Sequence, residues 1–161
     1  MGTTSPRVRS PWLAAFDCGV DELNNYLQRF ANQDQKRDLS RIHVLAEEMR
    51  IIGYYSISSH AVLTHELPDK QRISHYSATP FLLLGRLAVD KNFQQQGYGN
   101  ALIFHAFKTT MEAAEKIGIS GMVVDAKDEN AANFYEKFGF KRLSASPNRL
   151  VLPLTALAAL I

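Results

Sequence analysis

The stretch 81-FLLLGRLAVDKNFQQQGYGN-100 decides the organisation of this chain. Its first nine residues lack the alternation of a half-exposed strand, so they predict a central strand that is covered on both faces. Gly97 and Gly99 allow the backbone to approach a ligand and permit positive φ angles. A long helical pattern follows, and the first amides of a helix are unpaired and lie at the positive end of its dipole. The stretch therefore predicts a strand, a glycine loop and a helix start that together bind a phosphate group.

Two common phosphate loops do not fit this stretch. The dinucleotide fingerprint needs a third glycine, and Leu102 occupies that position. A nucleoside triphosphate loop ends in Gly-Lys-Ser or Gly-Lys-Thr, which is also missing here. What remains is the spacing Gln94-x-x-Gly97-x-Gly99 between a buried strand and a long helix.

The composition indicates an ordinary globular protein. The 161 residues fit one domain, residues 1–161, with 46% hydrophobic and 21% charged residues and a net charge of +2. Cys18 is the single cysteine, so neither a disulfide nor a cysteine metal cluster is expected, and the histidines show no ligand spacing. No stretch approaches the roughly 20 apolar residues of a membrane span. We expect a cytoplasmic protein without a metal or a membrane anchor.

The remaining patterns predict helices and strands in a fixed order. Gly53, inside one strand, marks a bulge or a close approach of another backbone. Asp128 is suited to cap the helix that follows it. The predicted elements are a helix at 21–35, a hairpin of 41–47 and 51–59, a loop with one short helix at 60–80, the central strand at 81–89, a helix at 100–117, a strand at 122–125 that forms a parallel crossover with the central strand, a helix at 129–138, and strands at 140–143 and 149–153.

Two motifs resemble one enzyme family. The spacing Gln94-x-x-Gly97-x-Gly99 resembles the first acetyl-CoA motif of the GNAT acetyltransferases, and Asn130-Ala-Ala-Asn-Phe-Tyr-Glu-Lys-Phe-Gly-Phe140 resembles the second. The resemblance implies an α/β (α+β) GNAT fold. Its central mixed, twisted sheet would have about six to seven strands, a splayed central strand pair and helices on both faces.

The same resemblance implies acetyl-CoA as co-substrate. Backbone groups of Leu87, Ala88 and Val89 would hold the pantetheine, with the Val89 amide as oxyanion donor, and loop amides would hold the pyrophosphate. The residues assigned to the cofactor in this way, besides those three, are Gln94, Gln95, Gln96, Gly97, Tyr98, Gly99, Asn100, Asn130 and Phe134.

Three further stretches are similar to the TacT-like GNAT toxins of bacterial toxin–antitoxin pairs. They are Phe16–Leu27, Gly85–Asp90 and the ending Leu152-Pro-Leu154. This resemblance implies acetylation of the α-amine of aminoacyl-tRNA, which stops translation. It also implies an antitoxin partner of the ribbon-helix-helix type and is compatible with a homodimer.

Tyr135 is the expected general acid for the departing thiolate. A phenol with a pKa of about 10 can protonate a thiolate whose conjugate acid has a pKa of about 8 to 9. The resemblance places the catalytic tyrosine of the family at Tyr135, and the alternative is that this ring only packs against Phe134 and Phe138.

No general base stands out from the sequence. His60, Glu47 and Glu48 are the options, and each is more simply a surface group. An α-amine has a pKa of about 7.7 to 8.0, so part of it is already neutral at cell pH and no base is required.

Basic residues near the first helix and in the central strand are the expected contacts for tRNA: Lys36, Arg37, Arg41 and Arg86. Arg86 has two readings, a phosphate contact or an ion pair with Asp90. Two other functions stay open. The acceptor could be a small amine or a protein N-terminus, or the chain could be a regulatory module that binds CoA without turnover.

Overall fold

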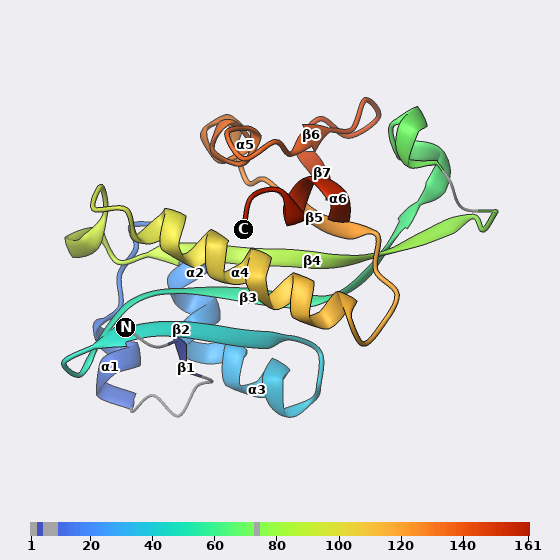
Figure 1. Ribbon diagram of the computed structural model, residues 1–161. Helices are drawn as coiled ribbons and strands as arrows, with labels where there is room; N and C mark the ends of the chain where they lie inside the picture. The colour runs from blue at the N-terminus through green and yellow to red at the C-terminus, as the bar shows by residue number, and fades with distance from the viewer. Residues whose placement is uncertain (1–2, 5–9, 73–74) are drawn as a thin grey trace. The chain divides into compact units, whose positions relative to one another are not determined.

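The computed structural model describes residues 3–4, 10–72 and 75–161. It divides into two compact units. Figure 1 shows the helices and strands of the chain, coloured from blue at the N-terminus to red at the C-terminus. The first unit contains residues 1–58 and 85–106, and the second contains residues 59–84 and 107–161. The chain passes from one unit to the other inside β3 (Arg50–Leu63), β4 (Ala78–Val89) and α4 (Tyr98–Ala114).

Helices and a hairpin build the first unit. The predicted hairpin is confirmed, since β2 (Arg41–Glu47) pairs antiparallel with β3. The short β1 (Thr3–Thr4) pairs with β2. The predicted first helix is also confirmed, as a run of α2 (Asp21–Asn25), a π-helical turn at Tyr26–Phe30 and α3 (Ala31–Lys36). A helix that the sequence did not predict, α1 (Ser10–Ala15), precedes this run.

Gly53 has both of the properties predicted for it. The β2–β3 register shifts between Leu45 and Ala46, so that Gly53 lies at a bulge. A Cβ on Gly53 would lie 2.6 Å from the carbonyl oxygen of Ala88 and 2.8 Å from Leu102 Cδ1. Only glycine allows this approach between β3 and β4 without a shift of backbone.

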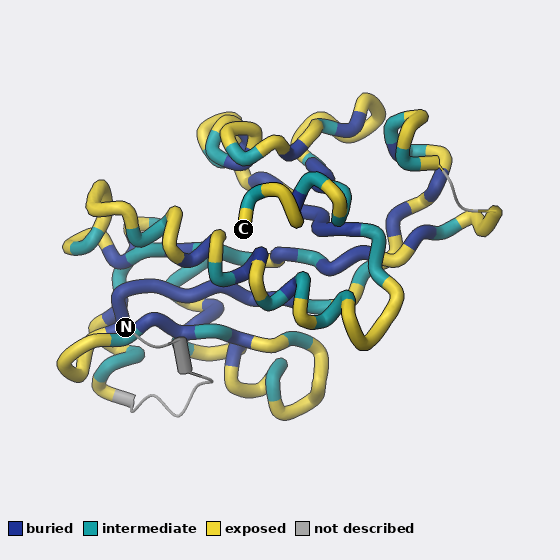
Figure 2. Tube along the Cα trace, viewed as in Figure 1, coloured by how far each residue is buried: buried dark blue, intermediate teal, exposed yellow. Residues whose placement is uncertain are grey.

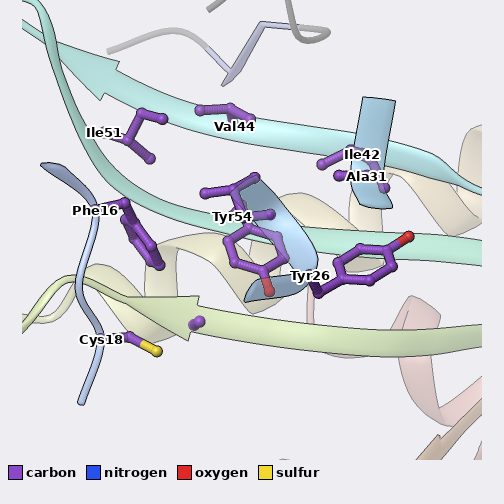
Figure 3. Close-up of a cluster of buried hydrophobic side chains, with 10 residues drawn as sticks. Phe16, Cys18, Tyr26, Ala31, Ile42, Val44, Ile51 and Tyr54 are labelled. Carbon is purple, nitrogen blue, oxygen red and sulfur yellow. The ribbon is translucent and has the colours of Figure 1, made fainter. Parts of the chain in front are cut away.

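The core of the first unit is rich in aromatic side chains. The Tyr54 ring meets the edge of Phe16 at 5.7 Å between centroids and stacks on Tyr26 at 6.4 Å. Phe16, Cys18 and Ile42 belong to the same buried cluster (Figure 3). Cys18 is therefore a packed thiol. The tube in Figure 2 shows the middle of β3 as one continuous buried run.

The second unit contains the parallel crossover that was predicted. β4 begins three residues earlier than expected and pairs in parallel with β5 (Gly121–Asp125) from Leu82 to Leu84, after which β4 runs on to Val89. This short pairing agrees with a splayed strand pair. β5 pairs antiparallel with β7 (Arg149–Pro153), and β7 pairs with β6 (Lys141–Arg142), which is shorter than predicted.

Helices and turns complete the second unit. Asp128 caps α5 (Glu129–Glu136) as predicted, because its Oδ1 accepts from the Ala131 amide at 2.8 Å. The loop before β4 holds two 3-10 turns, at Thr64–Glu66 and Asp69–Gln71, where one short helix was expected. The tail forms a helix that was not predicted, α6 (Leu154–Ala158), docked through the buried Leu157. Among the described helices, none is long and apolar enough to cross a membrane.

Candidate functional site

The glycine loop of the first unit has the backbone conformation that the predicted phosphate site requires. A 3-10 turn at Lys91–Phe93 leads into it, and Gln95 and Gly97 adopt φ angles of +62° and +87°. Residues with positive φ turn successive amides toward one point. Gly97 was predicted to do this, but Gly99 was wrongly given the same role. Gly99 lies inside α4 and lacks a positive φ, and Gln95 takes that conformation instead.

The start of α4 adds further donors. The Ala101 amide donates to the carbonyl oxygen of Gly97, the residue just before the helix, at 3.1 Å. The preceding amides, those of Tyr98, Gly99 and Asn100, are among the first four of the helix and have no intrahelical partner. The positive end of the helix dipole lies at the same place. The structure therefore brings the predicted pyrophosphate residues together.

Gln94 supports the loop through its side chain. Its Nε2 donates to the carbonyl oxygens of Val89 and Cys18, at 2.9 Å each. The side-chain amide therefore ties the loop to the end of β4. Gln96 makes a weaker bond of the same kind, from Nε2 to the Asn92 carbonyl at 3.3 Å. The first glutamine of the motif thus has a structural role that its predicted role as a ligand contact did not include.

Asp17 is an anchor for the loop that sequence reasoning missed. Its carboxylate accepts from the Gly19 amide and from Asn24 Nδ2, both at 2.9 Å, and pairs with Lys91 Nζ at 3.0 Å. Its backbone amide donates to Asp90 Oδ2 at 3.1 Å. The bond from Gly19, with Lys91 and Asn24, lowers the pKa of Asp17 to about 2. These contacts join the stretches 16–27 and 85–90, which the sequence connected only through their resemblance to toxins.

The peptide between Val89 and Asp90, at the end of β4, is hydrogen-bonded through both of its polar groups. The Val89 carbonyl accepts from Gln94, and the Asp90 amide donates to the Ile52 carbonyl at 2.7 Å. Ala88 is buried, with its carbonyl against Gly53, while Leu87 and Val89 are half-buried. The backbone here is held firmly, as an oxyanion donor requires. Its contacts with a cofactor stay a prediction.

Tyr135 lies in the second unit, near the end of α5. Its side chain is only 7% exposed, and its ring meets the edges of Phe134 at 5.2 Å and Phe140 at 5.6 Å. The ring therefore packs against Phe134, as the sequence suggested, and Phe140 is a further partner that the sequence did not indicate. Burial raises the pKa of Tyr135 above its usual value, so the phenol keeps its proton at cell pH. A general acid must start in this protonated form.

One arginine holds the helix that carries Tyr135. Arg142 donates to the Glu129 carboxylate in the first turn of α5 at 2.8 and 3.0 Å, and to Glu136 in the last turn at 2.8 and 2.9 Å. It also donates to Asn133 Oδ1 at 3.1 Å. This network fixes one face of α5. The other predicted cofactor residues of the helix, Asn130 and Phe134, are exposed and half-buried, respectively.

The residues predicted to contact RNA differ in whether a nearby carboxylate already pairs with them. Lys36 and Arg37 are exposed at the end of α3. Arg41 pairs with Asp38 at 2.7 Å and donates to the Gln35 carbonyl at 3.3 Å, so its charge serves the helix end. This favours the local role for Arg41 over a contact with RNA.

Arg86 does not pair with Asp90. Its guanidinium carbon lies 3.4 Å from the centroid of the Tyr26 ring, in the π-helical turn. The Asp90 carboxylate instead accepts from the amides of Asn92 and Asp17. The ion-pair reading of Arg86 is therefore wrong.

His60 is not arranged as a general base. Arg149 Nη1 lies 3.1 Å from His60 Nε2, and because arginine only donates, that nitrogen must accept. Arg149 is in turn held by two bonds to the Asp125 carboxylate, at 2.7 and 2.8 Å. His60 could take a proton at Nε2 only by giving up this bond. Glu47 and Glu48 are exposed beside the hairpin turn, so no described residue is assigned as base.

Residues 38–142 match the acetyltransferase (GNAT) domain family. The chain belongs to this family.

Similar proteins agree with the family and with the fold. A tRNA-acetylating toxin of Mycobacterium tuberculosis strain H37Rv is 31% identical over 149 residues, which cover 92% of this chain and 90% of that protein. The toxin AtaT complexed with acetyl-methionyl-tRNAfMet is 30% identical, with a TM-score of 0.87 and coverage of 98% of each chain. A mutant AtaT bound to the C-terminus of the antitoxin AtaR and acetyl-CoA is 27% identical, with a TM-score of 0.81 and coverage of 100% and 99%.

Removal of the Asp17 carboxylate should destabilise this GNAT domain in a pH-dependent way. We expect Asp17→Ala to lower the melting temperature at pH 7, because the Gly19, Asn24 and Lys91 donors lose their acceptor. A lowered pKa adds stability that is present above the unfolded value of 3.8 and is lost as pH falls toward about 2. Thermal unfolding from pH 7 to pH 2 should therefore show the gap to the unmodified protein closing below pH 4.

The matched control is Asp69→Ala, since the Asp69 side chain is 93% exposed and pairs with Arg72 at 3.2 Å on the surface. This variant should have the same melting temperature as the unmodified protein at every pH. A gap for Asp17→Ala that stays constant down to pH 2 would show that the carboxylate charge does not hold the loop.

Proposed function

We propose that this GNAT acetyltransferase is a toxin that transfers the acetyl group of acetyl-CoA to the α-amine of an aminoacyl-tRNA. The observation that carries the proposal is the glycine loop, where positive φ at Gln95 and Gly97 and the first amides of α4 converge at one helix end. Such an end suits the pyrophosphate of CoA. The tRNA-acetylating relative and the AtaT complex with acetyl-methionyl-tRNA support the choice of acceptor.

The proposed reaction is a direct transfer. The neutral amine attacks the thioester carbonyl carbon, and the Val89 amide stabilises the oxyanion. The C–N bond forms, the C–S bond breaks, and Tyr135 gives its proton to the departing sulfur. The amine loses one proton to solvent, and Tyr135 regains one from solvent. Because an α-amine has a pKa of about 7.7 to 8.0, the absence of an assigned base among the described residues agrees with this acceptor.

Cofactor contacts follow from the same proposal. Backbone groups of Leu87, Ala88 and Val89 hold the pantetheine, and Asn130 and Phe134 are the proposed cofactor residues of α5. The proposed pyrophosphate donors are the backbone amides of Gln95, Gln96, Gly97, Tyr98, Gly99 and Asn100, and Gln94 is a proposed cofactor residue beside them.

The proposed partners are the charged tRNA and an antitoxin. Lys36, Arg37 and Arg86 provide cations for RNA, and Arg41 is the weakest member because Asp38 neutralises it. The relative bound to the antitoxin AtaR supports an antitoxin partner. We further propose that this antitoxin is of the ribbon-helix-helix type, that the protein is a cytoplasmic homodimer, and that residues 1–161 form one functional domain.

The deciding experiment supplies acetyl-CoA, labelled in the acetyl group, with bulk aminoacyl-tRNA, uncharged tRNA, spermidine and a peptide with a free N-terminus. We expect label on aminoacyl-tRNA that is released with the amino acid by mild alkaline hydrolysis of the ester. If only spermidine or the peptide is labelled, the protein is an acetyltransferase for small amines or protein N-termini and the toxin proposal is wrong. Binding of acetyl-CoA without turnover on any acceptor would favour the regulatory module.

A further inference from the structure

The π-helical turn of the first unit leaves a phenylalanine ring open to solvent. In a regular α-helix, residues four apart share one face, so Phe30 would follow the buried Tyr26 toward the core. The turn instead closes with a bond from the Ala31 amide to the Tyr26 carbonyl and therefore holds one extra residue. Ala31 joins the core at 2% exposure, and Phe30 is left 47% exposed. Distortions of this kind are often found at functional sites.

Three cations lie around the exposed ring without a carboxylate partner. Arg37 comes seven residues after Phe30, so the two share one stripe of the helix. Arg29 and Lys36 are spaced in the same way and occupy the neighbouring stripe. All three cations are exposed, and none forms an ion pair within the part of the chain that the structure describes. The nearest acid, Asp34, accepts from a tyrosine hydroxyl at 2.9 Å.

The same helical run touches the strand that ends in the proposed oxyanion donor. The Arg86 guanidinium carbon lies 3.4 Å from the centroid of the Tyr26 ring, one turn before Phe30. Arg86 comes three residues before Val89 in β4. A continuous series of neighbouring residues thus leads from Val89 through Arg86 and Tyr26 to Phe30. A long acceptor with its amine at Val89 has this helix beside it.

We propose that Phe30, with Arg29, Lys36 and Arg37 around it, is a stacking platform for the unpaired 3′ end of the acceptor RNA. One nucleobase stacks on the exposed ring, and the cations contact the phosphates on either side of that base. Single-stranded RNA uses both features together, whereas an apolar protein partner needs no unpaired cations around the ring. The inference rests on the proposed function, since it names how the aminoacyl-tRNA is held.

Three variants of Phe30 separate stacking from apolar packing, with acetyl-CoA saturating and aminoacyl-tRNA varied. Phe30→Ala should raise KM for aminoacyl-tRNA about five- to 100-fold, the loss expected for one stacked base, while kcat stays unchanged. Phe30→Leu keeps an apolar side chain without a π face, so its KM should stay raised by about fivefold or more. Phe30→Trp should have a KM within about twofold of the unmodified protein. The dissociation constant for acetyl-CoA should be the same in all of them.

Arg37→Gln tests the cations around the ring. It should raise the same KM and lower the slope of log KM against log salt concentration by about 0.7, the share of one phosphate of a single strand. Met49→Ala is the matched control for Phe30, because Met49 is a 65% exposed apolar residue of the same unit. It should change neither KM nor its salt dependence.

A binding measurement makes the test independent of turnover. Uncharged tRNA with a fluorescent adenine analogue in its unpaired 3′ end should lose fluorescence on the unmodified protein and on Phe30→Trp, because the analogue stacks, and should keep it on Phe30→Ala. An unchanged KM for Phe30→Ala, or equal KM values for Phe30→Leu and Phe30→Trp, would overturn the inference. So would a Phe30→Ala variant that keeps its KM but loses self-association or a protein partner in sedimentation.

Failure of the proposed function gives a different result. The unmodified protein then does not acetylate aminoacyl-tRNA, and the fluorescence measurement still decides the platform. Loss of fluorescence that depends on the ring of Phe30 supports the platform, and fluorescence that does not respond to the unmodified protein overturns it.

Discussion

Replacing Tyr135 with phenylalanine should lower kcat by about 100-fold or more, because the reaction loses its proton donor. The ring keeps its edge contacts with Phe134 and Phe140, so the fold and the affinity for acetyl-CoA should be retained. Burial raises the pKa of the phenol, and the unmodified protein therefore carries the acid form throughout the neutral range. Single-turnover rates with acetyl-CoA and aminoacyl-tRNA, together with calorimetric binding of acetyl-CoA, measure the two quantities separately.

Tyr76→Phe is the matched control, since Tyr76 is 79% exposed and the substitution also removes one phenol. It should react at the rate of the unmodified protein. In cells, expression of the unmodified protein should arrest growth, and Tyr135→Phe should relieve the arrest. Full turnover by Tyr135→Phe would remove Tyr135 from the mechanism and leave only the packing role.

Local patterns were sufficient to predict most of this fold. The hairpin, the long helix α4 and the Asp128 cap follow from the polarity and spacing of neighbouring residues, and the structure confirms them. The glycine loop could also be predicted, because glycine is the residue expected where the backbone needs a positive φ angle. The exchange of Gly99 for Gln95 shows the limit of this reasoning, since a non-glycine residue can take the same φ when its surroundings hold it there.

Other features depend on contacts that no short stretch contains. Asp17 and Asp90 are 73 positions apart, and neither carries a motif that points to the other. The π-helical turn is five residues long, too short for its period to be separated from that of an α-helix. The Ser56 hydroxyl is buried without a hydrogen-bond partner among the described residues, which no pattern of neighbouring residues indicates. The sequence therefore predicted the conformation of the glycine loop at Gly97 but not the contacts of Asp17 and Gln94 that support it.

Gly53→Ala should damage both stability and cofactor binding. The new methyl group would lie 2.6 Å from the Ala88 carbonyl oxygen and 2.8 Å from Leu102 Cδ1. Leu102 can rotate, but the oxygen belongs to the backbone, so β3 and β4 must separate at Ala88. Overpacking of this kind costs about 1–3 kcal/mol, which corresponds to a melting temperature lower by about 2–12 °C.

The same shift moves the backbone that is proposed to hold pantetheine. Ala88 precedes Val89, so acetyl-CoA affinity should fall with the melting temperature. Gly118→Ala provides the control, because a Cβ there meets nothing within 4 Å, and it should change neither quantity. Calorimetry at a temperature well below unfolding separates the two effects. If Gly53→Ala melts early but binds acetyl-CoA with full affinity, the Gly53 contact stabilises the first unit without setting the cofactor strand, and the pantetheine contacts must be sought elsewhere on β4.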